Sequence, residues 1–374
     1  MRTLSLLSAL AASLLLVSAS PAEAEDPSAA AVDSSPTTDS SMSRGCNNPE
    51  KRKEWRKFKD TEKAAYIKAV NCLAKRPRSG KLKPQYPRSN ISSVNPSSSY
   101  YDDMVYVHMD QSDHIHYTGF FLPWHRWFVN EHVTQLKVQC GYTGVMPYWD
   151  WSQDASAFNA SAIFDPNPTS GLGGFSNPKN DYTITNGGFA NMKVAYPISH
   201  NIRRNFTLFP YVDWYWLQRP KEAANTTITK SFVDAAINGY TGDFIGFQNA
   251  TEKAQAFHPN IHMMIGGDMA GTCPAAAGSS CNPGSTFTAS DPLFFLHHAN
   301  IDRIWYLWQG KNKLNANAFK GGSISTYTDP AFPNGYEPWL NRTDPLPTDG
   351  MSTGNPTIQT VLSTTGGYLC YEYE

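Results

Sequence analysis

The chain has 374 residues, with 31 basic and 32 acidic side chains and a formal net charge of −1 at pH 7. This balance gives no electrostatic reason to expect nucleic acid or an anionic membrane surface as a partner. The part that follows the first 44 residues is long enough for two domains, but no second linker is visible in it. We therefore expect one large domain over residues 45–374.

The first 44 residues predict two segments outside this domain. Residues 1–24 are typical of a secretory signal, with Arg2 ahead of an apolar run and the small residues Ala19 and Ala24 behind it. The apolar run is too short to span a bilayer, and no later segment is expected to do so. Residues 25–44 are rich in Ser, Ala, Thr and Asp, which predicts a linker or a removed pro-segment. We therefore expect a secreted, extracellular protein.

The six cysteines support the same expectation, because an even number in a secreted chain suggests disulfides. Six cysteines allow 15 pairings, and the sequence alone does not choose among them. The arrangement we expect is Cys273–Cys281 as a local link, Cys72–Cys140 between helices and Cys46–Cys370 between the two ends of the domain. No two cysteines have CxxC spacing, so a zinc–thiolate site is not expected. Six glycosylation sequons fit the secretory route. They begin at Asn90, Asn159, Asn205, Asn225, Asn249 and Asn341.

The first element expected in the domain is a helix over residues 50–76. Asp60 or Thr61 would cap it, and Pro77 would end it. In that arrangement the basic run from Lys51 to Lys53 would lie on a solvated helix face.

Later helices are expected over residues 101–110, over 124–138, from near His258, and from Asp291 to Gln309. Turn-rich stretches over about 152–230 and 310–374 indicate loops and short strands. The predicted fold is mainly α, a central four-helix bundle surrounded by long loops and short strands. Bundle interiors often hold metals between facing side chains.

The histidines carry the functional signal. All but one of the ten fall into two groups, and His200 stands alone. A single histidine is more often an ordinary core or surface residue than a ligand. Two sets among aromatic residues weaken that explanation, because buried imidazoles need partners. The groups are His108, His114, His116, His125 and His132, and then His258, His262, His297 and His298.

In the second group, His258 and His262 have i, i+4 spacing, which brings two rings close enough to share a metal on a helix. Pro259 predicts that the helix begins at that residue, with His258 just ahead of it. His297 and His298 would point roughly 100° apart on a helix. One of them can therefore bind the metal while the other packs.

In the first group, His125 and His132 are about 10.5 Å apart along a helix, so at most one is a ligand of a shared metal. His125 lies in an aromatic run and is expected to be buried, whereas His132 is expected at the surface. Asp302, one turn beyond His298, is a candidate partner for that histidine.

Imidazole ligands suit copper, zinc, iron or nickel. The Glu-x-x-His spacing of di-iron bundles is not found. Two histidine sets in an aromatic pocket of a secreted protein favour copper and dioxygen, and zinc stays open as an alternative.

Two long motifs bear a family resemblance. One runs from His116 to Arg126 and is followed by Pro147–Trp151; the other comprises His258–His262, Ile265–Asp268 and Asp291–Arg303. The chain from about Cys46 to Glu374 resembles the tyrosinase/catechol oxidase (polyphenol oxidase) family of type-3 copper proteins, most closely the short secreted fungal type.

This resemblance implies two copper ions that activate dioxygen for the oxidation of a phenol to an ortho-quinone. It places Phe294 over the second copper and Met263 at the pocket wall. The implied partners are small phenolic substrates and dioxygen. The implied ligands are His108, His116 and His125 for one copper, and His258, His262 and His298 for the other.

Three departures from the family pattern concern His114, Val133 and Pro259. His114 replaces a cysteine that some relatives link to a ligand histidine. Val133 replaces a frequent Glu, with Glu131 two residues earlier. Pro259 replaces an Asn proposed to hold a water that deprotonates monophenols, which leads us to expect a preference for o-diphenols or methoxyphenols. Glu252 is a candidate to compensate.

Three other functions stay open at this point: a full tyrosinase with strong monophenol hydroxylation, a hemocyanin-like oxygen carrier, and a zinc hydrolase. A catechol assay separates the enzymes that oxidise phenols from a carrier, and metal analysis separates copper from zinc. The natural phenol and the oligomeric state are left open by the sequence.

Overall fold

The computed structural model describes residues 46–86, 91–325, 334–352 and 354–374. The expected signal (1–24), the expected linker or pro-segment (25–44) and the sequon at Asn90 lie outside these residues. Within the described part, no helix has the length and apolar character needed to cross a bilayer.

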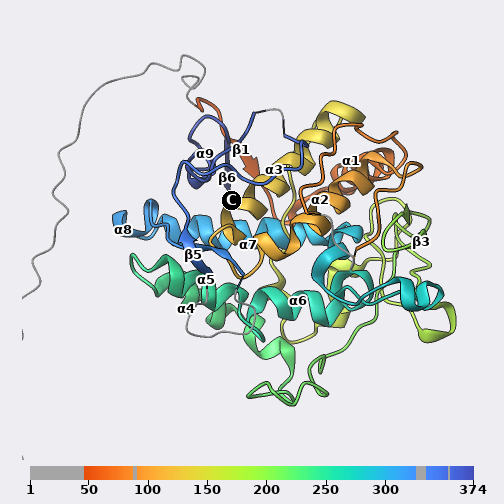
Figure 1. The fold of residues 1–374 in the computed structure, drawn as a ribbon. Coiled ribbons are helices and arrows are strands. Elements are labelled where there is room, and N and C mark those ends of the chain that lie inside the picture. The colour runs from red at the N-terminus through yellow and green to blue at the C-terminus, as the bar shows by residue number, and fades with distance from the viewer. Residues whose placement is uncertain (1–45, 87–90, 326–333, 353) are drawn as a thin grey trace, which may run out of the picture. The chain divides into compact units, whose positions relative to one another are not determined.

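Helices dominate the described residues, which confirms the prediction of a mainly α fold (Figure 1). The helices are α1 (Asp60–Leu73), α2 (Tyr100–Ile115), α3 (Phe121–Cys140), α4 (Lys230–Asn238), α5 (Phe244–Glu252), α6 (Phe257–Ile265), α7 (Leu293–Gln309), α8 (Lys313–Ala316) and α9 (Ile358–Leu362). The strands are β1 (Glu50–Arg52), β2 (Lys193–Val194), β3 (His200–Asn201), β4 (Gly322–Ile324), β5 (Tyr336–Trp339) and β6 (Tyr371–Tyr373).

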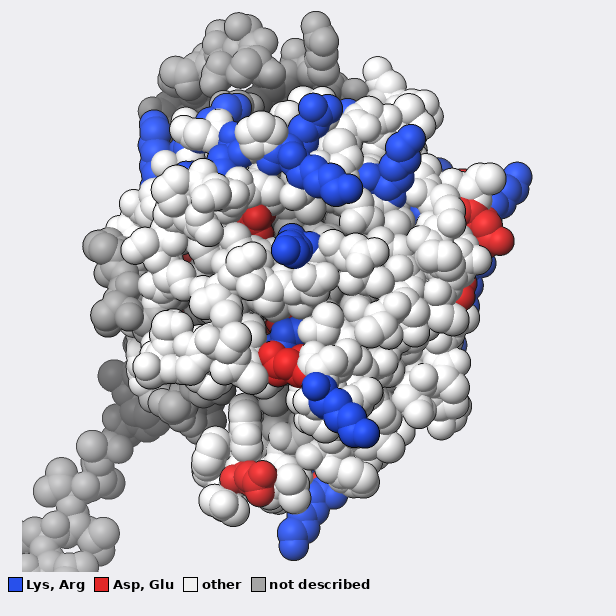
Figure 2. Space-filling view, turned by 90° about the vertical axis from the view of Figure 1, so that its right-hand side faces the viewer, with Lys and Arg blue, Asp and Glu red and all other residues white. Residues whose placement is uncertain are grey.

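Helix α7 lies at the centre and contacts both α3 and α6, and α2 contacts α3 (Figure 1). These four helices form the predicted bundle. Loops and two-stranded ribbons surround them. Figure 2 shows the side of the molecule that carries β3, where Lys and Arg gather along the upper edge and most of the remaining surface is uncharged.

Local signals explain where the bundle helices begin and end. The Ser99 side chain accepts a hydrogen bond from the Asp102 backbone N–H, and the Asp102 carboxylate accepts one from the Ser99 N–H, which caps α2. Gly266 ends α6 with a φ of +66°, and a β-carbon there would lie 2.1 Å from the carbonyl oxygen of Asn205. Only glycine fits this close approach.

The predicted helix over residues 50–76 is wrong in its first ten residues. α1 begins at Asp60, whereas β1 pairs in parallel with β6 at the other end of the domain. Arg52 is buried rather than solvated, with its guanidinium carbon 3.3 Å from the centre of the Tyr371 ring. The strand forms by pairing with β6, which lies more than 300 residues away in the sequence. Local periodicity gives no signal of so distant a partner, so the strand was not predicted.

Among the residues that the structure describes, Asp302 forms no hydrogen bond with His298, contrary to the expectation. Its carboxylate instead accepts hydrogen bonds from Arg126 and from the hydroxyl groups of Tyr371 and Tyr373. Arg52 also lies within 3.4 Å of it. Asp302 is therefore the centre of a buried charge network that joins α3, α7 and the β1–β6 pair.

His132 is also buried, so the prediction of a surface position is wrong. Its ring stacks on Phe295, with centroids 3.6 Å apart and planes 8° apart, and its Nε2 lies 3.3 Å from the Tyr66 hydroxyl. Helix α1 supplies Tyr66 and covers this side of α3. Burial lowers the pKa of His132 to about 3, so the ring is a neutral part of the core.

The three predicted disulfides, Cys46–Cys370, Cys72–Cys140 and Cys273–Cys281, are all formed. Cys46–Cys370 lies beside the β1–β6 pair, and Cys72–Cys140 joins the ends of α1 and α3. The disulfides therefore reinforce the contacts that hold the terminal strands and α1 against the bundle.

Candidate metal centre

The first histidine trio comes from α2 and α3. His108 lies in the middle of α2, His116 caps its C-terminal end, and His125 lies one turn into α3. Their ring centroids are 5.2–5.8 Å apart, and one nitrogen from each ring lies within 4.8 Å of the others. All three are buried, so the arrangement can surround a small cation.

The second group comes from α6 and α7. His258 and His262 lie on α6 with ring centroids 4.9 Å apart, and His297 and His298 follow each other on α7. One nitrogen from each of the four rings lies within 4.8 Å of the others. Helix α6 begins at Phe257, two residues before the predicted start, because Pro259 is accommodated in the first turn.

The two groups face each other across one space. The rings of His125 and His298 stack, with centroids 4.4 Å apart and planes 12° apart, and His125 and His258 are 6.5 Å apart. The bundle therefore brings together histidines that are more than 130 residues apart in sequence.

Hydrogen bonds fix the tautomers of four of these histidines. Nδ1 of each ring lies 2.8 Å from a backbone carbonyl oxygen, so Nδ1 carries the proton and Nε2 keeps its lone pair. The pairs are His108 with Thr286, His116 with Ser112, His125 with Phe121, and His262 with Met269. Lone pairs that converge in this way are what a metal ion requires.

His297 has the opposite tautomer. The indole N–H of Trp151, which can only donate, lies 3.2 Å from His297 Nδ1. Nδ1 therefore accepts, and a neutral ring carries its proton on Nε2. His298 Nδ1 has no hydrogen-bond partner in the part of the chain that the structure describes, and its Nε2 lies 3.3 Å from Nε2 of His262.

Several nitrogens of the site have no hydrogen-bond partner among the residues that the structure describes. They include Nε2 of His108 and of His125, and both ring nitrogens of His258. Buried polar atoms seldom stay unsatisfied, and a bound cation would satisfy these. The donor set therefore fits a metal.

Burial also keeps the site neutral. It lowers the pKa of His116 and of His262 to about 4, and it also holds the pKa of His108, His125 and His298 well below the usual value. Rings of this kind are deprotonated at neutral pH, and only the deprotonated ring binds metal.

Phe294 lies among the histidines. Its ring centroid is 4.1 Å from that of His298, 5.0 Å from His108 and 5.8 Å from His262, and the side chain is fully buried. It therefore packs the two groups together and does not reach the open pocket. Pro259 and Met263, by contrast, line the pocket.

The pocket has a volume of about 600 Å³ and opens over His116, His258 and His262. Its walls also include Glu252, Tyr211 and Trp214. The histidine, Pro259 and Met263 positions follow from the motifs, whereas Tyr211 and Trp214 come from a loop that carries no motif.

Glu252 is fully buried at the end of α5. One carboxylate oxygen accepts a hydrogen bond from the Tyr117 backbone N–H at 2.6 Å, and the other accepts one from the Gln248 side chain at 3.1 Å. Burial raises its pKa well above the usual value. Glu252 thus holds the residue that follows His116, at φ +55°.

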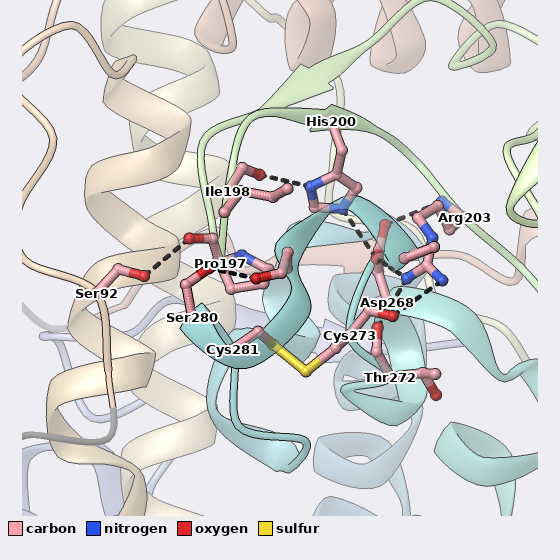
Figure 3. Close-up of a disulfide and its surroundings, with 12 residues drawn as sticks. Ser92, Pro197, Ile198, His200, Arg203, Asp268, Thr272, Cys273, Ser280 and Cys281 are labelled. Carbon is pink, nitrogen blue, oxygen red and sulfur yellow. Dashed lines mark hydrogen bonds and ion pairs between the residues drawn. A yellow bond between two sulfur atoms is a disulfide. The ribbon is translucent and has the colours of Figure 1, made fainter.

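A charge cluster supports the wall behind His262. The Asp268 carboxylate accepts hydrogen bonds from the His200 ring and from the Arg203 backbone N–H, both at 2.9 Å (Figure 3). The next carbonyl along the chain, that of Met269, accepts the His262 bond. Met269 lies four residues before Cys273, and the Cys273–Cys281 disulfide closes the loop that follows.

Two facing histidine groups inside a helical bundle are typical of binuclear metal proteins. The model of the common central domain of tyrosinase matches residues 98–311, which is more than half of the chain. The chain belongs to the tyrosinase family, whose members hold a binuclear copper centre.

Individual relatives extend the similarity over most of the chain. Tyrosinase P of Aspergillus terreus is 30% identical over 359 residues, which cover 88% of this chain and 93% of that protein. The tyrosinase-like protein phomQ1′ of Diaporthe leptostromiformis is 29% identical over 351 residues, which cover 90% of this chain and 83% of that protein. The structure of a mutant polyphenol oxidase from Thermothelomyces thermophila has a TM-score of 0.64 at 26% identity and covers 87% of this chain and 89% of that chain.

Proposed function

We propose that this protein is a secreted copper oxidase that uses dioxygen to oxidise o-diphenols to o-quinones. Methoxyphenols, and weakly monophenols, would be further substrates. The observation that carries the proposal is the convergence of two buried histidine trios beside an open pocket. Membership in the tyrosinase family supports the same chemistry.

Each trio would hold one copper. His108, His116 and His125 would bind the first copper, and His258, His262 and His298 the second. Hydrogen bonds at Nδ1 leave an Nε2 lone pair on four of these rings, those of His108, His116, His125 and His262. The rings of His258 and His298 each have a nitrogen with no hydrogen-bond partner among the described residues. His297 is left out, since its bond from Trp151 places the proton on Nε2. When bound, the copper pair supplies the site for dioxygen and accepts the electrons that the phenol loses.

The other residues shape how a phenol reaches this site. Phe294 keeps the trios packed and excludes water between the rings. Met263 and Pro259 border the pocket above His262 and His258, where an entering ring would rest against them. The opening next to His258 favours an enzyme over a hemocyanin-like carrier, because a carrier must keep phenols away from the metal.

Pro259 supports the preference for diphenols. It has no side-chain donor and no N–H with which to hold a water near the entering phenol. Glu252 has both carboxylate oxygens engaged by Tyr117 and Gln248. Asp113 is the other carboxylate of the pocket wall. With no group at position 259 to hold a water beside either carboxylate, deprotonation would be poor for a monophenol, which needs it more than an o-diphenol does.

Oxygen uptake with catechol and with tyrosine tests this proposal. We expect faster uptake with catechol, and we expect Pro259→Asn to raise the tyrosine-to-catechol rate ratio at least about tenfold, a part of what a positioned base contributes. A wild-type protein that prefers tyrosine would overturn the diphenol preference. Absence of uptake with either phenol by copper-loaded protein would point to a carrier, and zinc in place of copper would point to a hydrolase.

Secretion is part of the proposal. The three disulfides support it, because such bonds persist in oxidising compartments. The apolar N-terminal run supports it from the sequence.

A further inference from the structure

A closed loop over residues 208–224 projects from the copper-site helix α6 (Figure 1). The Ala224 N–H donates to the Leu208 carbonyl at 2.8 Å, which closes the loop at its base. On one side of the base, the Thr207 N–H donates to the Met264 carbonyl at 3.1 Å; on the other, the Asn260 side chain donates to Ala224 at 3.0 Å. Both arms are therefore fixed to the helix that carries His258 and His262.

This loop carries a row of three aromatic rings that leads out of the pocket. Tyr211 is buried and Trp214 is half-buried, and both line the pocket. Their rings meet edge to face at 5.2 Å. Trp216 stacks on the outer side of Trp214 at 5.5 Å, with planes 25° apart, and is 73% exposed.

The row offers apolar surface beyond what one phenol ring needs. Cavities of roughly 300–1,000 Å³ hold drug-sized ligands, and this one has about 600 Å³. Between Leu208 and Gln218 the loop has a single charged side chain, Asp213. Four large apolar side chains of this loop, Phe209, Val212, Tyr215 and Trp216, are exposed, and exposed apolar patches often mark ligand or partner sites.

We propose that Trp214 and Trp216 bind the second aromatic ring of the substrate while its catechol ring lies at the histidines. The inference rests on the proposed function and names its substrate class, uncharged catechols that carry a further aryl group. A second ring is favoured over another protein chain because the row starts in the pocket wall and is continuous with the site. Tyr211 packs edge to face against Trp214 and holds that ring in position.

Paired kinetics test the proposal. Catechol has one ring and 4-phenylcatechol has two, so Trp216→Ala should raise KM for 4-phenylcatechol about 3- to 10-fold, as expected for loss of one aromatic pair, and leave KM for catechol and both kcat values unchanged. Trp339→Ala is the matched control, because Trp339 is a 43% exposed tryptophan on β5 that does not line this pocket. It should change neither KM.

A binding measurement separates this inference from the oxidase activity. Calorimetry with 4-methoxybiphenyl, which lacks a free hydroxyl group, should show binding to the wild-type protein that Trp216→Ala weakens by a similar factor. If catechol is not oxidised but this loss is seen, the proposed function fails and the ring subsite stands. Equal KM shifts for both catechols would overturn the subsite. So would a Trp216→Ala protein that loses only self-association in size-exclusion chromatography, which would assign the row to contact between copies.

Discussion

Replacement of His298 by alanine is expected to lower bound copper from two ions to one per chain and to reduce catechol oxidation by more than about a hundredfold. Outer partners of metal ligands already cost about 10- to 100-fold when they are lost, so a direct ligand should cost more. His298 faces His262 with their Nε2 atoms 3.3 Å apart, which is where a shared ion would lie. Copper quantification after dialysis, together with oxygen uptake, measures both effects.

His297→Ala is the matched control for this substitution. Both residues are buried in α7, but His297 Nδ1 accepts the Trp151 bond and its Nε2 carries the proton. The variant should keep two coppers, while the buried Trp151 N–H that loses its acceptor lowers stability by about 1–3 kcal/mol. Loss of a copper from His297→Ala, with both kept in His298→Ala, would assign the adjacent histidines the other way round.

Asp302→Ala should lower the free energy of unfolding by about 3–5 kcal/mol. Removing one partner of a buried ion pair leaves the other charge unpaired, which accounts for that size. Arg126 and Arg52 would lose their carboxylate in the interior, and the Tyr371 and Tyr373 hydroxyls would lose their acceptor. Urea denaturation at pH 7 measures the change.

Asp234→Ala is the control for Asp302, because its ion pair with Lys230 is exposed. Such pairs contribute only about 0–1 kcal/mol, so this variant should unfold near the wild-type midpoint. A similar loss in the two variants would show that the buried network does not stabilise the fold.

The same network predicts how stability depends on pH. Burial alone would raise the pKa of Asp302, but Arg126, Arg52 and the two tyrosine hydroxyls outweigh it and hold the pKa below the usual value. A depressed pKa contributes stability above the unfolded-state value of about 4, and that stability is lost as pH falls through the folded-state value. The difference between wild type and Asp302→Asn should therefore shrink in acid below about pH 4.

Much of the fold was predictable because its helices carry local signals. Pro292 precedes α7, Ser99 caps α2, and apolar residues recur along both helices. The β1–β6 pair could not be predicted, since Arg52 and Tyr373 are more than 300 residues apart and each strand has only three residues. The surface position predicted for His132 was wrong for a related reason. Helix α1 covers this residue, and the periodicity of α3 alone does not reveal that contact.

The candidate site also has a part that the sequence predicts and a part that it does not. Histidine spacing and aromatic context predict which rings converge, because i, i+4 positions and bundle helices have known geometry. The roles of Glu252 and Trp214 could not be predicted. Glu252 acts through the backbone of Tyr117, and Trp214 reaches the pocket through a loop whose path depends on its hydrogen bonds to α6.

The central claim is that six imidazoles hold two copper ions side by side. Crystals of the copper-loaded protein, measured at the copper absorption edge, test it directly. The proposal predicts two anomalous peaks per chain, one among the Nε2 atoms of His108, His116 and His125 and the other among those of His258, His262 and His298. A single peak, or peaks outside these trios, would contradict it.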